Sequence, residues 1–169
     1  MTVSRISTLQ DIFNLSLAAG DRELASDFYF EIIGEEQIGI LMKGFSVPFI
    51  SAGEAVEVPG PVGSSHWQAS QVDYKFQSAV QFTETVAGTL DAFLMRIVAR
   101  PGAKFDARIY SGTPDNFSRV RFLRQCLVKI DPADVDHENR QSLLLVSGTL
   151  SYHYFGESKP GPRLLTNVR

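Results

Sequence analysis

The chain has a single cysteine, Cys126, among its 169 residues. An internal disulfide is therefore excluded, and one thiol gives no sign of an oxidising compartment. No apolar run approaches the roughly 20 residues that a membrane-spanning helix needs. The N-terminal segment also lacks the uninterrupted apolar core of a signal peptide. We therefore expect a soluble protein that is made in the cytoplasm.

The sequence also lacks the short motifs that carry much enzyme chemistry. Its three histidines, His66, His137 and His153, are scattered, with no second His or Cys at a metal-binding spacing. Neither a P-loop nor a G-x-S-x-G motif occurs. The acidic segment at residues 131–138, DPADVDHE, does not follow the order of a calcium loop. The sequence thus predicts no enzyme, no metal site and no cofactor.

Charge is low overall, with a formal net charge of −3, but it is unevenly distributed. Residues 24–59 hold six carboxylates and one lysine, whereas residues 101–130 hold six basic and two acidic side chains. A mildly acidic chain with few aromatic residues beside its arginines is a poor candidate for nucleic-acid binding. The two segments can be solvated faces, can pair within the chain, or can orient neighbouring subunits.

The clearest positive feature is residues 74–85, YKFQSAVQFTET, where apolar and polar side chains alternate almost without a break. Because successive side chains on a strand point to opposite sides, this segment predicts a long strand with one packed and one solvent-facing side. That pattern favours an antiparallel sheet over a buried parallel one. The apolar side holds Tyr74, Phe76, Val80 and Phe82, and the polar side holds Lys75, Gln77, Gln81, Thr83 and Thr85.

Helices are predicted at two places. Residues 88–99 have five large apolar side chains on one helical face and are followed by Pro101-Gly102. An N-terminal amphipathic helix is predicted to be capped by Ser7 and to end at Gly20. The five apolar side chains in residues 88–99 are Leu90, Phe93, Leu94, Ile97 and Val98.

Further strands are predicted from shorter apolar runs. Residues 27–33 and 37–45 are expected to pair through a tight turn at residues 34–36. In residues 118–130, Val120 and Phe122 alternate with Arg119 and Arg121, and the pattern slips near Leu123, which fits a β-bulge. The remaining predicted strands cover residues 104–110 and residues 142–155, the latter packed through Leu144, Val146, Leu150, Tyr152 and Tyr154.

Residues 46–71 predict a long loop or loose hairpin, because prolines and glycines interrupt them repeatedly. Loops of this length in a compact domain usually have an interaction role. The predicted fold is mainly β (α+β): an antiparallel β-sandwich or barrel-like sheet with one packed helix and a long inter-subunit loop. It comprises an N-terminal arm (1–23), a β domain (24–156) and a C-terminal tail (157–169) that is expected to be mobile.

The order of these elements resembles the tail tube proteins of contractile-tailed bacteriophages, a family related to the haemolysin-coregulated tube protein of type VI secretion. The resemblance covers roughly residues 24–156. The matching pieces are the strand DFYFEII, the loop GFSVPFISAGEAVEVPGPVGSSHWQA, the strand YKFQSAVQFTET before the helix LDAFLMRIVA, and the strand LLLVSGTLSYHYF after the loop DPADVD.

The resemblance implies a structural subunit whose hexameric rings stack into a hollow tube for DNA passage during ejection. It implies a virion tail location, after assembly in the host cytoplasm. The implied partners are further copies of the chain, a tail sheath protein, a baseplate or tube initiator, a tail terminator, and a tape measure protein and DNA in the lumen. DNA would pass without sequence-specific binding, and no membrane contact is implied.

Within that architecture, two sets of residues are predicted to face other molecules. The inter-subunit contacts are expected at Phe49, Ile50, Val56, Val58, Trp67, Arg119 and Arg121. The channel is expected to be lined by Gln77, Gln81 and Thr83, because a neutral wall avoids the counterion-release term that lysine and arginine add at phosphates.

Two alternatives stay open. One keeps the architecture but makes the chain a ring protein of type VI secretion or another contractile injection system, or a baseplate tube initiator. The other belongs to a different class: a small β-barrel that binds an apolar ligand in a cavity lined by Trp67 and the aromatic strand faces.

Overall fold

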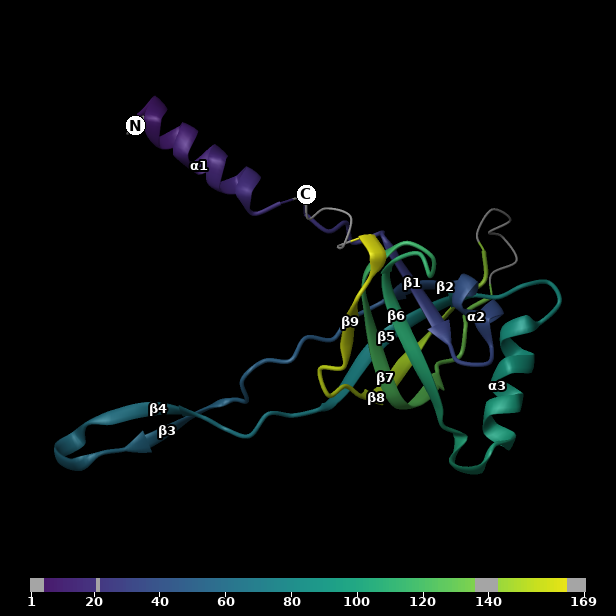
Figure 1. The fold of residues 1–169 in the computed structure, drawn as a ribbon. Coiled ribbons are helices and arrows are strands. Elements are labelled where there is room, and N and C mark those ends of the chain that lie inside the picture. Colours follow the sequence, from purple (N-terminus) through teal and green to yellow (C-terminus); the bar gives the residue numbers. More distant parts are fainter. Residues whose placement is uncertain (1–4, 21, 136–142, 164–169) are drawn as a thin grey trace.

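The fold is built on one antiparallel sheet of seven strands, seen in a computed structural model that describes residues 5–20, 22–135 and 143–163 (Figure 1). The strands are β1 (Phe28–Ile32), β2 (Met42–Phe45), β5 (Lys75–Thr83), β6 (Phe105–Gly112), β7 (Phe117–Ile130), β8 (Leu145–His153) and β9 (Ser158–Pro160). Their spatial order is β1-β6-β7-β8-β5-β2, and β9 pairs with β7. The mainly β, antiparallel prediction is therefore confirmed, and the sheet is open between β1 and β2.

Strand β7 links the two halves of the sheet. Its first half pairs with β6 and β9, and its second half pairs with β8. The predicted bulge is present: Gln125 has a φ of 50°, and its N–H donates to Asp106 Oδ1 at 2.9 Å. Because of this extra residue, Leu123 and Cys126 both point into the core, where neither is exposed.

One arginine of β7 is buried, and the others are not. Since Leu123 faces the core, Arg121 lies on the same side of β7, opposite Ile109 of β6. Only 4% of Arg121 is exposed. The simple alternation of arginines outside and apolar residues inside is thus wrong at Arg121, although Arg119 is exposed as expected.

Helix α3 (Thr89–Ala99) confirms the predicted helix and packs beside the sheet through Leu90, Phe93 and Ile97. The Phe93 ring meets Phe105 edge to face, with centroids 6.1 Å apart. Val98 was expected on this packed face, but it is 73% exposed. The helix therefore contributes a narrower apolar stripe than the sequence spacing indicates.

The start of α3 is capped by a residue from the end of β5. The Glu84 carboxylate accepts hydrogen bonds from the N–H groups of Leu90 and Asp91, both at 3.0 Å, and from Thr85 at 2.8 Å. Burial alone raises the pKa of Glu84, but these backbone hydrogen bonds outweigh it and lower the pKa below its ordinary value. The first turn of α3 thus depends on an ionised carboxylate.

The predicted strand at residues 37–45 is mostly wrong. Helix α2 (Glu36–Leu41) occupies its first part, and only β2 is extended. Ile38 is buried within the helix, and the chain passes so close to β1 that a Cβ atom on Gly39 would collide with the Phe30 carbonyl oxygen. The predicted hairpin is also wrong, because β1 pairs with β6 and β2 pairs with β5.

Pairing of β1 with β6 brings the acidic and basic segments together inside one chain. Glu31 lies opposite Arg108 in the register, and the two form an ion pair of 3.3 Å. Tyr110 also donates to Glu31 at 2.8 Å. Burial and this hydrogen bond raise the pKa of Tyr110. Part of the uneven charge is therefore balanced within the subunit.

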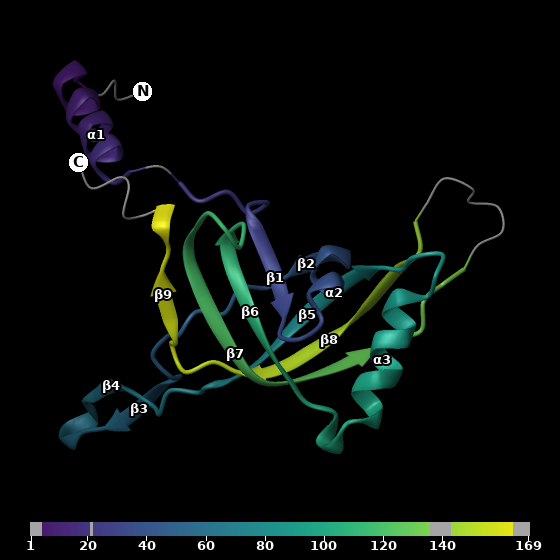
Figure 2. The same cartoon turned by 45° about the vertical axis from the view of Figure 1, so that its right-hand side comes forward.

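The two ends of the described chain differ from each other. Helix α1 (Ile6–Ala18) begins one residue before the predicted Ser7 cap, has no buried residue, and stands apart from the sheet (Figure 2). At the other end, the tail expected to be mobile contains β9. No helix in the described residues is long and apolar enough to span a membrane.

A second, two-stranded sheet interrupts the chain between β2 and β5. Strands β3 (Ala55–Pro59) and β4 (Ser65–Ala69) form an antiparallel hairpin, with a short 3-10 turn at Pro61–Gly63. Figures 1 and 2 show this hairpin extending away from the main sheet. We call residues 46–73 the arm; the name no longer refers to the N-terminal segment 1–23. The seven-stranded sheet together with α2 and α3 is called the body.

Candidate assembly surfaces

The arm exposes almost its whole hairpin. All five residues of β4 are exposed, and in β3 only Val58 is partly covered. The hairpin is held by its own ladder, and at its base the Ser70 N–H donates to the Glu54 carbonyl at 2.9 Å. A lone two-stranded hairpin is marginally stable in water. An arm of this kind has apolar side chains available for another surface.

The register divides the predicted contact residues between two faces of the hairpin. Val56 lies opposite Gln68 and Val58 opposite His66, whereas Trp67 lies opposite Glu57. Residues directly opposite each other share a face. Val56 and Val58 are therefore on one side and Trp67 is on the other, so that the arm presents two different surfaces.

The stem of the arm rests on the body through two further predicted contact residues, Phe49 and Ile50. The Phe49 ring lies 5.2 Å from the Arg121 guanidinium carbon, within cation–π range. Arg121 also donates to Ser111 Oγ at 3.3 Å. A Cβ atom on Gly156 would lie 3.0 Å from Ile50 Cδ1. Within the chain, Arg121 thus anchors the stem, and its part in a contact between subunits stays a prediction.

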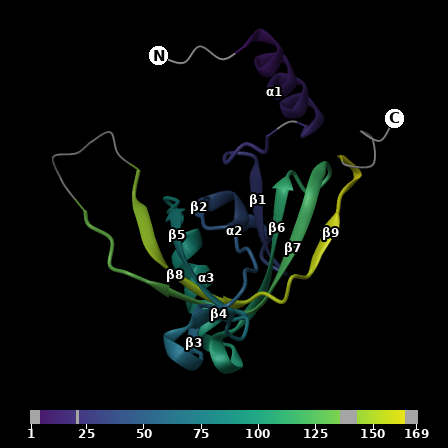
Figure 3. The same ribbon diagram turned by 90° about the vertical axis from the view of Figure 1, so that its left-hand side faces the viewer.

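The predicted channel residues belong to a neutral, polar face of β5 and β8. Gln77 lies opposite Ser151, and Gln81 lies opposite Ser147. Thr83 is half-buried, and its hydroxyl donates to the Leu41 carbonyl at 3.2 Å. Figure 3 shows β5 and β8 side by side. The serines of β8 were not predicted as part of this face, although the two-residue alternation along the strand places them on the side opposite its packed side chains.

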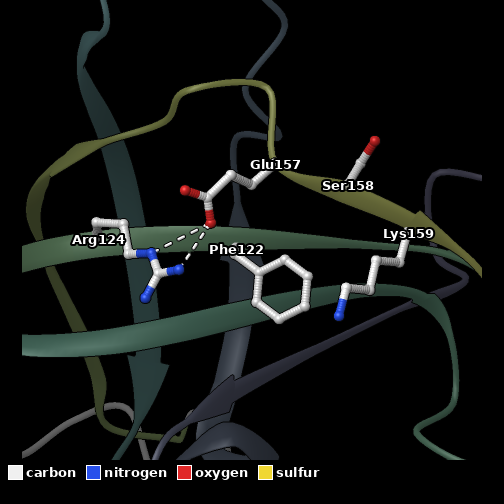
Figure 4. Close-up of a pocket in the computed structure, with 5 residues that line it drawn as sticks. All are labelled: Phe122, Arg124, Glu157, Ser158 and Lys159. Carbon is white, nitrogen blue, oxygen red and sulfur yellow. Dashed lines mark hydrogen bonds and ion pairs between the residues drawn. The ribbon is translucent and has the colours of Figure 1, made fainter.

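A surface cleft lies between β7 and the segment that carries β9 (Figure 4). Its volume is about 320 Å³, near the lower end of the range of roughly 300–1,000 Å³ for small-molecule pockets. Arg124 pairs with Glu157 at 2.8 Å, and the Lys159 ammonium lies 5.5 Å from the Phe122 ring centroid. We call this the β7–β9 cleft; the remaining lining residue is Ser158.

The side chains of the described residues do not form a metal site or a reactive nucleophile. These residues include no group of three His, Cys, Asp or Glu side chains placed to hold a metal ion. Burial raises the pKa of the Cys126 thiol to about 12, which makes it a poor nucleophile. Trp67 is 71% exposed on the arm, so it does not line an interior cavity of the kind that a barrel binding an apolar ligand requires.

Comparison with known proteins gives matches at the level of structure. No protein-family model and no curated protein matches the chain. A chain of the sheath-tube complex of an extracellular contractile injection system, PVC, in the extended state is similar with a TM-score of 0.65 and 12% identity, covering 94% of this chain and 100% of that one.

Two further solved structures come from the ends of such assemblies. A chain of the PVC sheath/tube terminator in the extended state has a TM-score of 0.60 and 15% identity, over 78% of this chain and 93% of that one. A chain of the anti-feeding prophage tube-terminating cap has a TM-score of 0.61 and 11% identity, over 86% and 99%. At these identities the likeness shows a shared fold.

Proposed function

We propose that the chain is a structural subunit of a phage tail tube, forming hexameric rings that stack around a channel for DNA. The observation that carries the proposal is the arm, whose hairpin exposes apolar side chains on both faces. The fold shared with chains of contractile injection assemblies supports the same role. In this role the protein needs no substrate and no cofactor, and its surfaces perform the function.

Two unlike surfaces on one subunit are compatible with ring formation. The arm and the body differ in shape, so an arm that docks on another subunit makes a head-to-tail contact. Repetition of such a contact closes a ring or continues as a filament, depending on the rotation between neighbours. The open sheet, with β1 and β2 at its ends, also has edges that assembly can cover.

The neutral face of β5 and β8 is the proposed channel wall. Glutamine, serine and threonine side chains solvate a passing phosphate backbone without the counterion release that makes basic surfaces bind DNA tightly. Gln77, Gln81 and Thr83 therefore keep their proposed role, and Ser147 and Ser151 join them across the strand pair. Lys75 and Lys129 are the basic residues that flank this wall on β5 and β7.

The proposed partners follow from this role. They are further copies of the chain, the tail sheath outside the tube, the baseplate or initiator at one end and the terminator at the other. A tape measure protein and DNA would occupy the lumen in turn. The corresponding location is the virion tail, assembled in the host cytoplasm.

A second candidate is favoured by the likeness to a tube terminator and a terminating cap. Such a chain would form one ring at the end of a tube made by another protein. A ring subunit of type VI secretion or another injection system is a variant of the tube proposal, with a protein cargo in place of DNA.

Negative-stain electron microscopy of the purified chain, with its mass measured in solution, tests the proposal. Six-fold rings that stack into hollow tubes are expected. Single rings that never stack would favour the terminator or initiator. A monomer that neither forms rings nor adds to a purified baseplate would contradict the proposal.

A further inference from the structure

The arm carries charge of one sign only. Residues 46–73 include Glu54, Glu57 and Asp73, and they contain no lysine or arginine. Glu57 lies directly opposite Trp67 on one exposed face of the hairpin. Among the described residues, Glu57 has no ion-pair partner within 4.0 Å. This face therefore presents an indole and an unpaired carboxylate together.

The β7–β9 cleft has the complementary chemistry. Two cations lie over its Phe122 ring: the Arg108 guanidinium carbon at 5.9 Å and the Lys159 ammonium at 5.5 Å from the centroid. Arg108 and Arg124 already pair with Glu31 and Glu157. Lys159 is exposed and pairs with no carboxylate in the described part of the chain. The cleft thus offers an aromatic floor with an uncompensated ammonium at its edge (Figure 4).

We propose that the Trp67–Glu57 face of one subunit's arm docks in the β7–β9 cleft of the next copy. Trp67 packs against Phe122, and the Glu57 carboxylate accepts a hydrogen bond from Lys159. The inference rests on the proposed function, and it names the receiving surface for the arm.

Geometry and charge both make a second copy the occupant. The hairpin extends away from its own body (Figures 1 and 2), so the arm offers its tip to another molecule. Its purely acidic charge matches the free cation of the cleft, and complementary charges steer and orient association. Aromatic side chains at the centre of a contact, with a charged pair at its rim, are typical of protein interfaces.

Cysteine cross-linking tests the contact directly. The one native thiol, Cys126, is buried, so engineered cysteines are the reactive ones. With a mild oxidant present, a Glu57→Cys chain mixed with a Lys159→Cys chain should form disulfide-linked dimers at least roughly tenfold faster than a matched control pair, because docking raises the effective thiol concentration. The control pairs Val56→Cys, on the opposite hairpin face, with Lys159→Cys.

Charge exchange provides an independent readout. Glu57→Lys and Lys159→Glu should each lower assembly by roughly tenfold, the equivalent of about 1.4 kcal/mol. The double exchange should restore it if the two side chains meet. Unfolding midpoints of all three variants should match the parent chain, since both positions are exposed.

The outcomes separate this inference from the proposed function. Normal tubes with equal cross-linking in the test and control pairs would contradict the contact and leave the tube role intact. An unsubstituted chain that forms no assembly, alone or on a baseplate, and shows no preferred cross-link would contradict both.

Discussion

The body and the arm use the same kinds of residue in opposite ways. In the body, aromatic and aliphatic side chains such as Phe30, Phe93 and Leu123 are at most 1% exposed. In the arm, Trp67 and Val56 face solvent although they are equally apolar. The difference shows that the body buries its core within one chain, whereas the hairpin of the arm leaves its apolar side chains exposed. Under the proposed function, stability therefore depends mainly on the body and assembly mainly on the arm.

Helix α1 resembles the arm more than the body. Its apolar side chains, including Leu9, Ile12 and Phe13, are all exposed. Contiguous apolar surface is rare on soluble monomers and commonly marks a contact site. The chain therefore has two projecting elements on a folded centre, and both are expected to gain their packing in an assembly.

The largest effect on stability is expected from the core of the body. Phe93→Ala removes a fully buried ring from α3 and should lower the free energy of unfolding by about 3–5 kcal/mol. The matched control is Met95→Ala on the exposed side of the same helix, where less than about 0.5 kcal/mol is expected. Urea unfolding followed by circular dichroism measures both; equal losses would break the division between buried and exposed faces.

A smaller loss is expected where α2 closes against β1. Gly39→Ala places a methyl group against the Phe30 carbonyl and should cost about 1–3 kcal/mol through overpacking. Gly44→Ala in β2 is the control, because the nearest atom to its new Cβ, Gln81 Oε1, lies 4.0 Å away. Thermal unfolding of the two variants checks the difference. A Gly39→Ala chain as stable as the Gly44→Ala chain would show that α2 has room to move.

The smallest of the three effects concerns the cap of α3. Glu84→Gln should lower stability by about 1 kcal/mol near neutral pH, because the amide is a weaker acceptor for the helix N–H groups. The pKa of Glu84 is lowered by folding, so its contribution to stability is fully present above the ordinary pKa of a glutamate in the unfolded chain. It should disappear as pH falls through the lower folded pKa.

Unfolding free energies of the parent and Glu84→Gln chains at a series of pH values test this assignment. The two curves should converge on the acid side. A gap that stays constant from neutral to acid pH would argue against an ionised cap. The exposed Glu54→Gln is the matched control and should change stability by less than about 0.5 kcal/mol.

Local periodicity predicted the elements that carry their own signal. The alternation in residues 75–83 and the helical spacing in residues 89–99 were each strong enough to predict β5 and α3. Helix α2 was missed because its apolar run is short, and short runs fit either period. The spacing of Ile38, Leu41 and Met42, three and then one residue apart, was the helical signal available.

Local sequence patterns do not indicate which strands pair when the partners are far apart in the chain. Nothing in the residues of β1 indicates that its partner is β6, about 75 residues later in the chain, rather than the next apolar run. The same limit applied to Arg121, which is in contact with Phe49, 72 residues earlier in the chain, and with Ser111 of β6. The arm was recognised from its prolines and apolar residues, but its two faces required the hairpin register.

Removal of the hairpin tests the division between body and arm most directly. The change deletes residues 55–69 and joins Glu54 to Ser70 through two glycines, which suits ends already linked by a backbone hydrogen bond. The free energy of unfolding of the chain without the hairpin should stay within about 0.5 kcal/mol of the parent's. This chain should form no rings or tubes under the electron microscope. Tubes at the parent's yield, or a body that no longer folds, would contradict the account.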